Sequence, residues 1–177
     1  MVRIAVTGRP PCDLAPVRAA VHAALRPYGL PAGARIGLAF VDDFLMKELN
    51  TRHRRKRKTT DVLSFGQRLP RGAKGAAAGR ALVRDVDGEL EVGDIVISGA
   101  QAALQARRRR HPLAREVAFL AAHGALHLLG FEDDTREGYN EMVRLGLSAI
   151  ARPVRKRRSR LPPEPRSGPS AMANMRP

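Results

Sequence analysis

Runs of apolar residues with the periods of strands and helices divide the first 150 residues of the chain into predicted elements. Short β-branched or alternating runs, bounded by turn residues or charges, predict four strands: residues 3–7, 35–41, 61–65 and 93–98. Apolar positions at helical spacing predict five helices: residues 14–25, residues 44–50, a helix beginning after Ser98, one from Pro112 to Leu128, and one over 135–150.

Two stretches of the chain lack such a pattern. Residues 68–90 are rich in Gly, Ala and Arg, which predicts a flexible basic loop or hairpin without a packed element. From Arg152 onward the chain is mostly Pro, Arg, Ser and Lys, and this composition buries too little apolar surface to offset the entropy of ordering. A hydrophobic content of 44% over 177 residues supports a core. We therefore expect one domain over residues 1–151 and a disordered basic tail over residues 152–177.

The most informative motif lies at the end of the long predicted helix before the last one. His123 and His127 are four residues apart, so both side chains lie on one helix face with Cβ atoms about 5–6 Å apart. Gly130 then allows the chain to turn back, and three carboxylates follow it: Glu132, Asp133 and Asp134. Two imidazoles and a carboxylate are a known ligand set for catalytic zinc, which keeps a further position for water.

Two half-buried histidines followed by an acidic cap for the next helix would give the same pattern. The turn at Gly130 and the basic character of the chain favour the metal site. Gly124 occupies the position directly after the first histidine, where the zinc-protease motif requires a glutamate as general base. The motif therefore favours phosphodiester over peptide hydrolysis. Ser64 has no histidine placed in sequence to activate it, so we expect a structural role for its hydroxyl.

The charge of the chain points to a polyanionic partner. Lys and Arg number 32 against 17 Asp and Glu, a formal net charge of +15, which favours nucleic acid ahead of a membrane surface. Aromatic residues make up 4%, so contacts with phosphates are expected rather than base stacking as the main binding mode. A solvated charged surface is the alternative, but separate like-charge clusters repel one another unless a polyanion relieves them. Two cationic runs lie within the predicted domain: Arg52, Arg54, Arg55, Lys56, Arg57 and Lys58, and then Arg107, Arg108, Arg109 and Arg110.

Other sequence features restrict the class of protein. Cys12 is the only cysteine, which excludes an internal disulfide and a thiolate-rich zinc site. No apolar run approaches the roughly 18 residues of a membrane span, and no export signal is evident at the N-terminus. We expect a cytoplasmic protein without a membrane partner.

Several blocks of residues resemble the YbeY family of endoribonucleases, also described as rRNA maturation factors. The run from His123 to Asp133 is similar to the family pattern H-G-x-x-H-L-x-G-[YF]-[DE]-H. Residues 60–65 (TDVLSF) and 93–98 (GDIVIS) are similar to two other signature segments, and Asn50 and Arg54 fit the family element L-N-x-x-x-R. The resemblance covers roughly residues 36–150.

The resemblance implies a single-domain α+β fold, in which a small mixed sheet of about four strands packs against helices and a zincin-like metal site lies on the central helix. It implies one Zn²⁺ per chain, held by His123, His127 and Asp133, with Arg54 contacting phosphate as a catalytic residue beside His123. Asp133 stands where the family pattern has a third histidine, and a carboxylate there admits other divalent ions. Glu132 competes as a ligand, although Asp133 occupies the matching position.

The activity implied by the resemblance is metal-dependent, single-strand-specific cleavage of RNA in 16S rRNA 3′-end processing, ribosome maturation and quality control. The implied partners are rRNA and the small ribosomal subunit, with ribosomal proteins as further candidates and no specificity for DNA. The cationic runs of residues 52–58 and 107–110 then become RNA-binding candidates. The alternatives are a non-catalytic RNA-binding ribosome-assembly factor with a structural metal, and a metallohydrolase of another substrate, which would leave the cationic runs unexplained.

Overall fold

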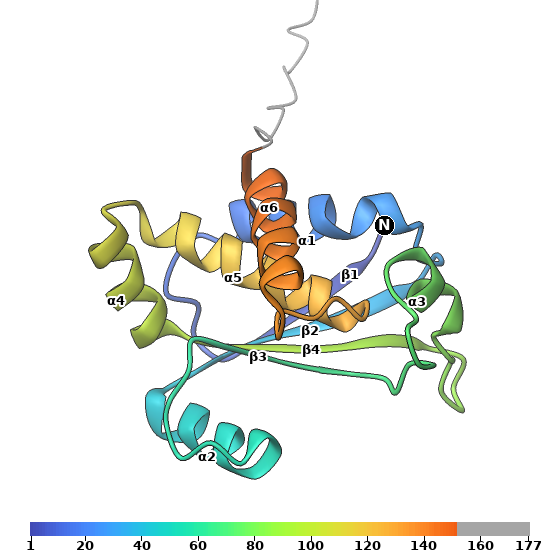
Figure 1. The fold of residues 1–177 in the computed structure, drawn as a ribbon, viewed down its shortest axis with the longest axis horizontal. Helices are drawn as coiled ribbons and strands as arrows, with labels where there is room; N and C mark the ends of the chain where they lie inside the picture. Colours follow the sequence, from blue (N-terminus) through green and yellow to red (C-terminus); the bar gives the residue numbers. More distant parts are fainter. Residues whose placement is uncertain (152–177) are drawn as a thin grey trace, which may run out of the picture.

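The computed structural model describes residues 1–151, and the tail predicted over residues 152–177 lies outside the described part of the chain (Figure 1). The elements in chain order are β1 (Arg3–Thr7), α1 (Ala15–Leu25), the short 3₁₀ helix η1 (Arg26–Tyr28), β2 (Ala34–Val41), α2 (Asp43–Arg54), β3 (Val62–Gly66), α3 (Ala76–Ala81), β4 (Leu90–Ser98), α4 (Gly99–Arg109), α5 (Leu113–Leu128) and α6 (Arg136–Ala151). The four predicted strands and the five predicted helices are all present.

The four strands form one mixed sheet in the order β1-β2-β4-β3. β1 pairs with β2, and β2 with β4, in parallel, whereas β3 runs antiparallel to β4 and occupies an edge of the sheet. The expected α+β fold with a small mixed sheet is confirmed. No helix within residues 1–151 is long and apolar enough to span a membrane.

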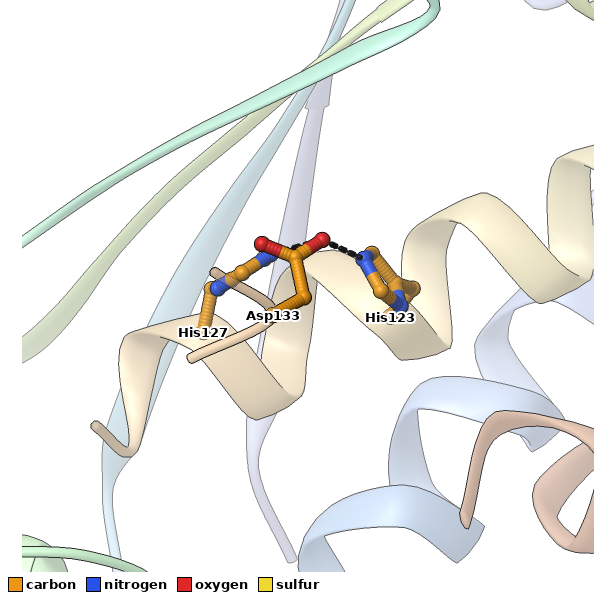
Figure 2. A group of neighbouring side chains, drawn as sticks. All are labelled: His123, His127 and Asp133. Atoms are coloured by element: carbon orange, nitrogen blue, oxygen red, sulfur yellow. Dashed lines mark ion pairs between the residues drawn. The ribbon is translucent and has the colours of Figure 1, made fainter. Parts of the chain in front are cut away.

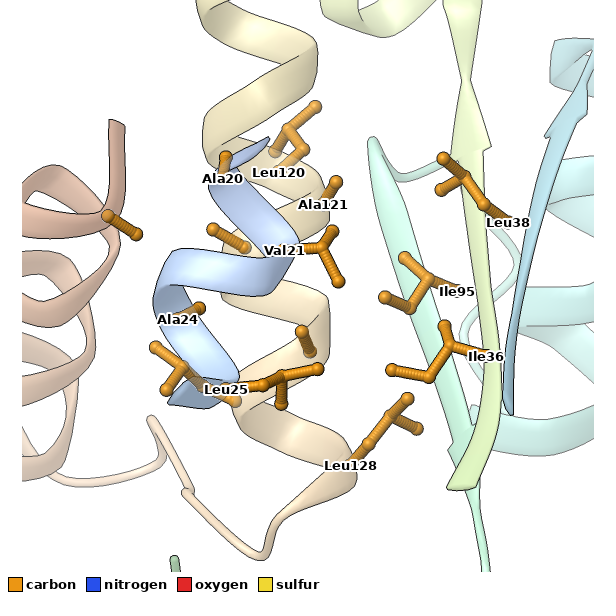
Figure 3. Close-up of a cluster of buried hydrophobic side chains, with 14 of the residues drawn as sticks. Ala20, Val21, Ala24, Leu25, Ile36, Leu38, Ile95, Leu120, Ala121 and Leu128 are labelled. Carbon is orange, nitrogen blue, oxygen red and sulfur yellow. The ribbon is translucent and has the colours of Figure 1, made fainter. Parts of the chain in front are cut away.

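The main core lies between one face of the sheet and the helices α1 and α5 (Figure 3). Burial alternates along β2, so that Ile36 and Leu38 point into this core at 0% and 1% exposure. Ile95 of β4 and Val21 of α1 join them, as expected for a sheet with one buried face. The helix α6 packs across α5 and α1 on the side away from the sheet (Figure 1).

The opposite face of the sheet carries α2 (Figure 1). Met46 of this helix is fully buried in a second, small cluster with Leu63 of β3 and Val96 of β4. Asp42 caps α2 by accepting a hydrogen bond of 2.8 Å from the Leu45 N–H. The helix ends at Arg54, four residues later than the apolar pattern predicts. Its last turn is exposed and basic, so it carries no apolar residue that would mark it as helical in the sequence, while its cationic side chains suit the C-terminal end of a helix.

The expectation of a loop without a packed element over residues 68–90 is wrong. The segment contains α3, whose Ala78 is fully buried, and β4 begins at its end, at Leu90, rather than at Gly93. Small residues made the segment look weakly patterned, yet they allow close packing: a Cβ added to Gly79 would lie 3.0 Å from the Leu30 side chain.

Candidate metal centre and cleft

His123 and His127 lie one turn apart on α5, with side chains 11% and 19% exposed. Asp133 comes from the segment that joins α5 to α6 and turns back over this helix end (Figure 2). Its Oδ2 lies 3.3 Å from His123 Nε2 and 3.7 Å from His127 Nε2. One potential ligand atom from each of the three residues therefore lies within 4.8 Å of the other two.

These distances can be tested against the geometry of a metal site. Ligand atoms about 2.0–2.1 Å from a tetrahedral Zn²⁺ are about 3.4 Å apart. The two measured separations between Asp133 and the histidines, 3.3 Å and 3.7 Å, are of this size. Two imidazoles and a carboxylate also suit zinc chemically. The widest separation among the three ligand atoms, up to 4.8 Å, exceeds this value, so the residues fit a bound divalent ion once one side chain shifts toward it.

The ring of His127 is oriented by a backbone carbonyl. Its Nδ1 lies 2.8 Å from the carbonyl oxygen of Phe131. In the tautomer in which Nδ1–H donates to this oxygen, the lone pair of Nε2 faces Asp133 and is free to bind a metal. A backbone or carboxylate partner of this kind commonly fixes the orientation of a metal-binding histidine.

His123 is held differently. Its Nδ1 is buried and has no hydrogen-bond partner among the described residues. Burial lowers the pKa of His123 below its ordinary value, and His127 acts in the same direction, while Asp133 opposes both. The environment thus favours the neutral imidazole, which is the form that binds metals.

Gly124 and Ser64 allow α5 to pack closely against the sheet. A Cβ at residue 124 would lie 2.7 Å from Ile95 Cγ2 and 2.9 Å from Ser64 Oγ, so only glycine allows this approach. The Ser64 hydroxyl donates a 3.1 Å hydrogen bond to the Gly124 carbonyl. The hydroxyl therefore has the structural role expected of it, because it ties β3 to the part of α5 that carries the two histidines.

The turn that returns Asp133 is built on Gly130. Its φ is +73°, and a Cβ there would lie 2.2 Å from the Ala73 carbonyl oxygen, so glycine is required on both grounds. The Gly75 N–H donates a 2.8 Å hydrogen bond to the Leu129 carbonyl. Lys74 lies over the Phe131 ring, 4.8 Å from its centroid. Residues 73–75, inside the segment predicted as a loop, thus support the turn of the candidate metal centre.

A cleft of about 690 Å³ adjoins His123, His127 and Asp133. Of the first cationic run, the cleft is lined by Arg54, Lys56 and Lys58, and not by Arg52, Arg55 or Arg57. The segment after the helix end begins with Arg55 in the left-handed conformation and has no regular secondary structure up to β3, so its side chains point in different directions. Only half of this run therefore faces the candidate metal centre.

The second cationic run divides in the same way. Arg109 lines the cleft, whereas Arg107 and Arg110 line a separate hollow beside the start of α5. Arg108 is exposed and lines neither. The structure therefore brings one arginine of four to the candidate site.

Sequence reasoning missed Arg115 and Glu116, which also line the cleft. Glu116 is fully buried, accepts a 2.7 Å hydrogen bond from Arg109 and lies 2.9 Å from His111 Nε2. It stands seven residues before His123, which is two helical turns, and that spacing was a signal that could have placed it on the same helix face. Asn50, which the resemblance singled out together with Arg54, also lines the cleft.

Comparison with known proteins gives consistent matches. A family model described as "Endoribonuclease YbeY" matches residues 14–151. The protein named Endoribonuclease YbeY of Moorella thermoacetica is 42% identical over 122 residues, which cover 69% of this chain and 74% of that protein. The protein of the same name from Desulforamulus reducens is 40% identical over 121 residues, or 68% of this chain and 73% of that one.

A solved structure shares the fold. The solution structure of TM1509 from Thermotoga maritima superposes with a TM-score of 0.52 and 20% identity, and the match covers 85% of this chain and 90% of that one. At this level of identity the match concerns the architecture alone.

Proposed function

The chain belongs to the YbeY endoribonuclease family, and from this premise we propose that it is a metal-dependent hydrolase that cleaves single-stranded RNA during the processing of 16S rRNA. The observation that carries the proposal is the position of His123, His127 and Asp133, three potential ligands that border a cleft also lined by Arg and Lys side chains. Relatives named as endoribonucleases favour this activity over a non-catalytic assembly factor.

In the proposed mechanism His123 Nε2, His127 Nε2 and one Asp133 carboxylate oxygen hold a single ion, with zinc as the first candidate. When bound, such an ion polarises a phosphoryl oxygen and acidifies water. Phe131, through its carbonyl, keeps the His127 ring in the orientation that binding requires. The ligand set contains one carboxylate, so a harder divalent ion is the second candidate.

Arg54 is the proposed phosphate-contacting catalytic residue. It ends α2, is exposed and lines the same cleft as His123. A guanidinium can pair with two non-bridging phosphate oxygens at once and stabilise the charge that develops on them during cleavage. Lys56 and Lys58 lie on the same side of the cleft and would attract the neighbouring phosphates.

The wider role is also a proposal. We expect rRNA in the small ribosomal subunit to be the substrate, ribosomal proteins to be further contacts, and the cytoplasm to be the place of action. No preference for DNA is expected, because the proposed substrate is an RNA strand.

The test compares the purified full chain with the variants His123→Ala and Arg54→Gln. Bound metal is measured by elemental analysis, and cleavage of a single-stranded RNA is measured before and after removal of metal with a chelator. We expect wild type to lose cleavage with the metal and regain it on addition of zinc, His123→Ala to lose both, and Arg54→Gln to keep the metal but cleave slowly. Full cleavage by metal-free wild type would refute the proposal.

A further inference from the structure

The cleft beside the candidate metal centre has two chemically different sides. One side carries Arg54, Lys56 and Lys58 from the end of α2 and the segment that follows it. Another side is formed by α6, which contributes Tyr139, Val143, Leu147 and Ile150. A substrate that fills this cleft must therefore present both negative charge and apolar surface.

The four α6 residues form a continuous stripe. Their spacings of four, four and three residues keep them on one helix face over about 16 Å. The last three of them each follow by one position a residue that α6 buries in the core: Met142, Gly146 and Ala149. The cleft stripe is thus a second apolar face of α6, beside the face that packs against the rest of the fold.

This stripe is incompletely covered in the described part of the chain. Tyr139 is 53% exposed and Leu147 is 45% exposed. Val143 and Ile150 are partly buried. Single exposed apolar side chains are common on protein surfaces, but a stripe in register along one cleft, with two exposed members, marks a binding surface. The same cleft also contains His127 and Asp133, so the stripe is continuous with the candidate metal centre.

We propose that the α6 stripe binds the unpaired bases of the RNA strand while Arg54, Lys56 and Lys58 bind its phosphates. This inference rests on the proposed function and assigns the base-contacting residues. The charge of the opposite side selects a polyanion, and the apolar stripe selects a polyanion with exposed aromatic faces. A duplex keeps its base faces stacked inside, so this division of the cleft would itself discriminate against double-stranded RNA.

The stripe also predicts how the RNA strand is oriented along α6, relative to the candidate metal centre. Tyr139 lies in the first turn of α6, six residues after Asp133, and would contact a base close to the scissile phosphate. Leu147 is eight residues further along the helix, about 12 Å away, and would contact a more distant base. Tyr139 is also the only aromatic residue in the stripe, which makes it the residue suited to stacking.

The test measures binding of two fluorescent probes, kept intact in the presence of a chelator. One probe is a single-stranded RNA, and the other is an oligomer of the same length whose ribose-phosphate backbone carries no bases. We expect Tyr139→Ala to weaken RNA binding about fivefold or more, the lower range for one stacked base, and Leu147→Ser to weaken it in the same direction through lost apolar contact. Their affinity for the abasic probe should equal that of wild type, and Tyr139→Phe should retain RNA binding.

Matched controls are Leu104→Ser and Phe44→Ala, because Leu104 and Phe44 are 39% and 78% exposed but line no part of the cleft. Equal weakening of both probes, or losses no larger than those of the controls, would overturn the inference. An unchanged RNA affinity would also overturn it and would leave another partner, such as a protein, for the stripe. Because binding is measured without metal, a wild type that binds in this way but never cleaves RNA would refute only the proposed function.

Discussion

At the scale of single residues, we expect Asp133 to decide which ions the candidate centre accepts. Its carboxylate contributes a negative charge and a hard oxygen ligand beside two imidazoles. We expect Asp133→Ala to lower zinc affinity at least tenfold, and Asp133→His to retain zinc while weakening Mn²⁺. Competition with a chromophoric chelator measures both affinities. Equal Zn²⁺ affinity in wild type and Asp133→Ala would exclude Asp133 as a ligand.

Gly124 is a second position where the residue type matters, because it lies between the two histidines in the helix and packs directly against the sheet, where a side chain has no room. In Gly124→Ala the new Cβ would meet Ile95 and Ser64 at 2.7 Å and 2.9 Å. Overpacking costs about 1–3 kcal/mol, and the better helix propensity of alanine returns about 1 kcal/mol. We expect a net loss of up to about 2 kcal/mol in the free energy of unfolding, measured by denaturant titration, together with weaker metal binding.

A control for this prediction is the double variant Ser64→Ala with Gly124→Ala. Removal of the Ser64 hydroxyl relieves one of the two close contacts, so the double variant should lose less stability than the sum of the single variants. Strict additivity, or a Gly124→Ala variant as stable as wild type, would show that α5 can move away from the sheet without cost.

At the scale of elements, Asn50 connects α2 to the basic segment that follows it. Its side chain is 2% exposed, and its Nδ2 donates a 2.7 Å hydrogen bond to the Lys58 carbonyl. Asn50→Ala leaves this carbonyl without its partner, and we expect a loss of about 1–3 kcal/mol in stability. Lys56 and Lys58 would also be less well oriented, so the KM for RNA should rise.

Glu48→Ala is a suitable control, since Glu48 is an exposed residue of the same helix. Its effect on stability should stay within about 0.5 kcal/mol. If Asn50→Ala changed stability and KM no more than Glu48→Ala, the amide would have no part in placing the segment.

The same elements show what sequence can predict. The regular strands and helices follow from strong apolar periodicity, and the pairing of His123 with His127 follows from the helix alone. By contrast, α3 is made of Ala and Gly with one Arg, so it has no large apolar residue to mark its buried side. The approach of Asp133 depends on the turn at Gly130, which is itself supported by residue Ala73, far away in the sequence.

At the scale of the whole molecule, the fold of residues 1–151 distributes the cationic side chains over separate surfaces. A run of arginines looks uniform in sequence, yet α4 ends within this run. As a result Arg109 lines the cleft, whereas Arg110 lines the separate hollow beside the start of α5. No local pattern shows which side of a helix end will face a cleft, because that depends on how α4 packs beside α5. For this reason the cationic runs could be predicted from the sequence, but which of their residues line the cleft could not.

A comparison of Arg109→Gln with Arg110→Gln tests this division. Each phosphate contact with a single strand contributes about 0.7 to the slope of log affinity against log salt concentration. We expect Arg109→Gln to reduce the slope by about this amount and Arg110→Gln to leave it unchanged, as measured by titration of RNA at several salt concentrations. Equal slopes for the two variants would contradict the assignment.

Arg109 also pairs with the buried Glu116, so its removal affects stability as well as binding. The double variant Arg109→Gln with Glu116→Gln removes the buried carboxylate that has lost its arginine partner and should be more stable than Arg109→Gln alone. If it shows the same reduced salt slope, the change in slope comes from the lost cation and not from a disturbed fold.

The edge position of β3 has a consequence for hydrogen exchange. Within residues 1–151 this strand pairs only with β4, so alternate backbone amides on its outer side lack a sheet partner. Residues 60–64, at the start of the strand, line the cleft. Among them, the Val62 N–H already donates a 2.8 Å hydrogen bond to Asp61 Oδ1. The other outward-facing amides should exchange with deuterated solvent rapidly in the free protein and slowly when a strand of RNA lies beside them, so hydrogen exchange would show whether the cleft is occupied even without cleavage.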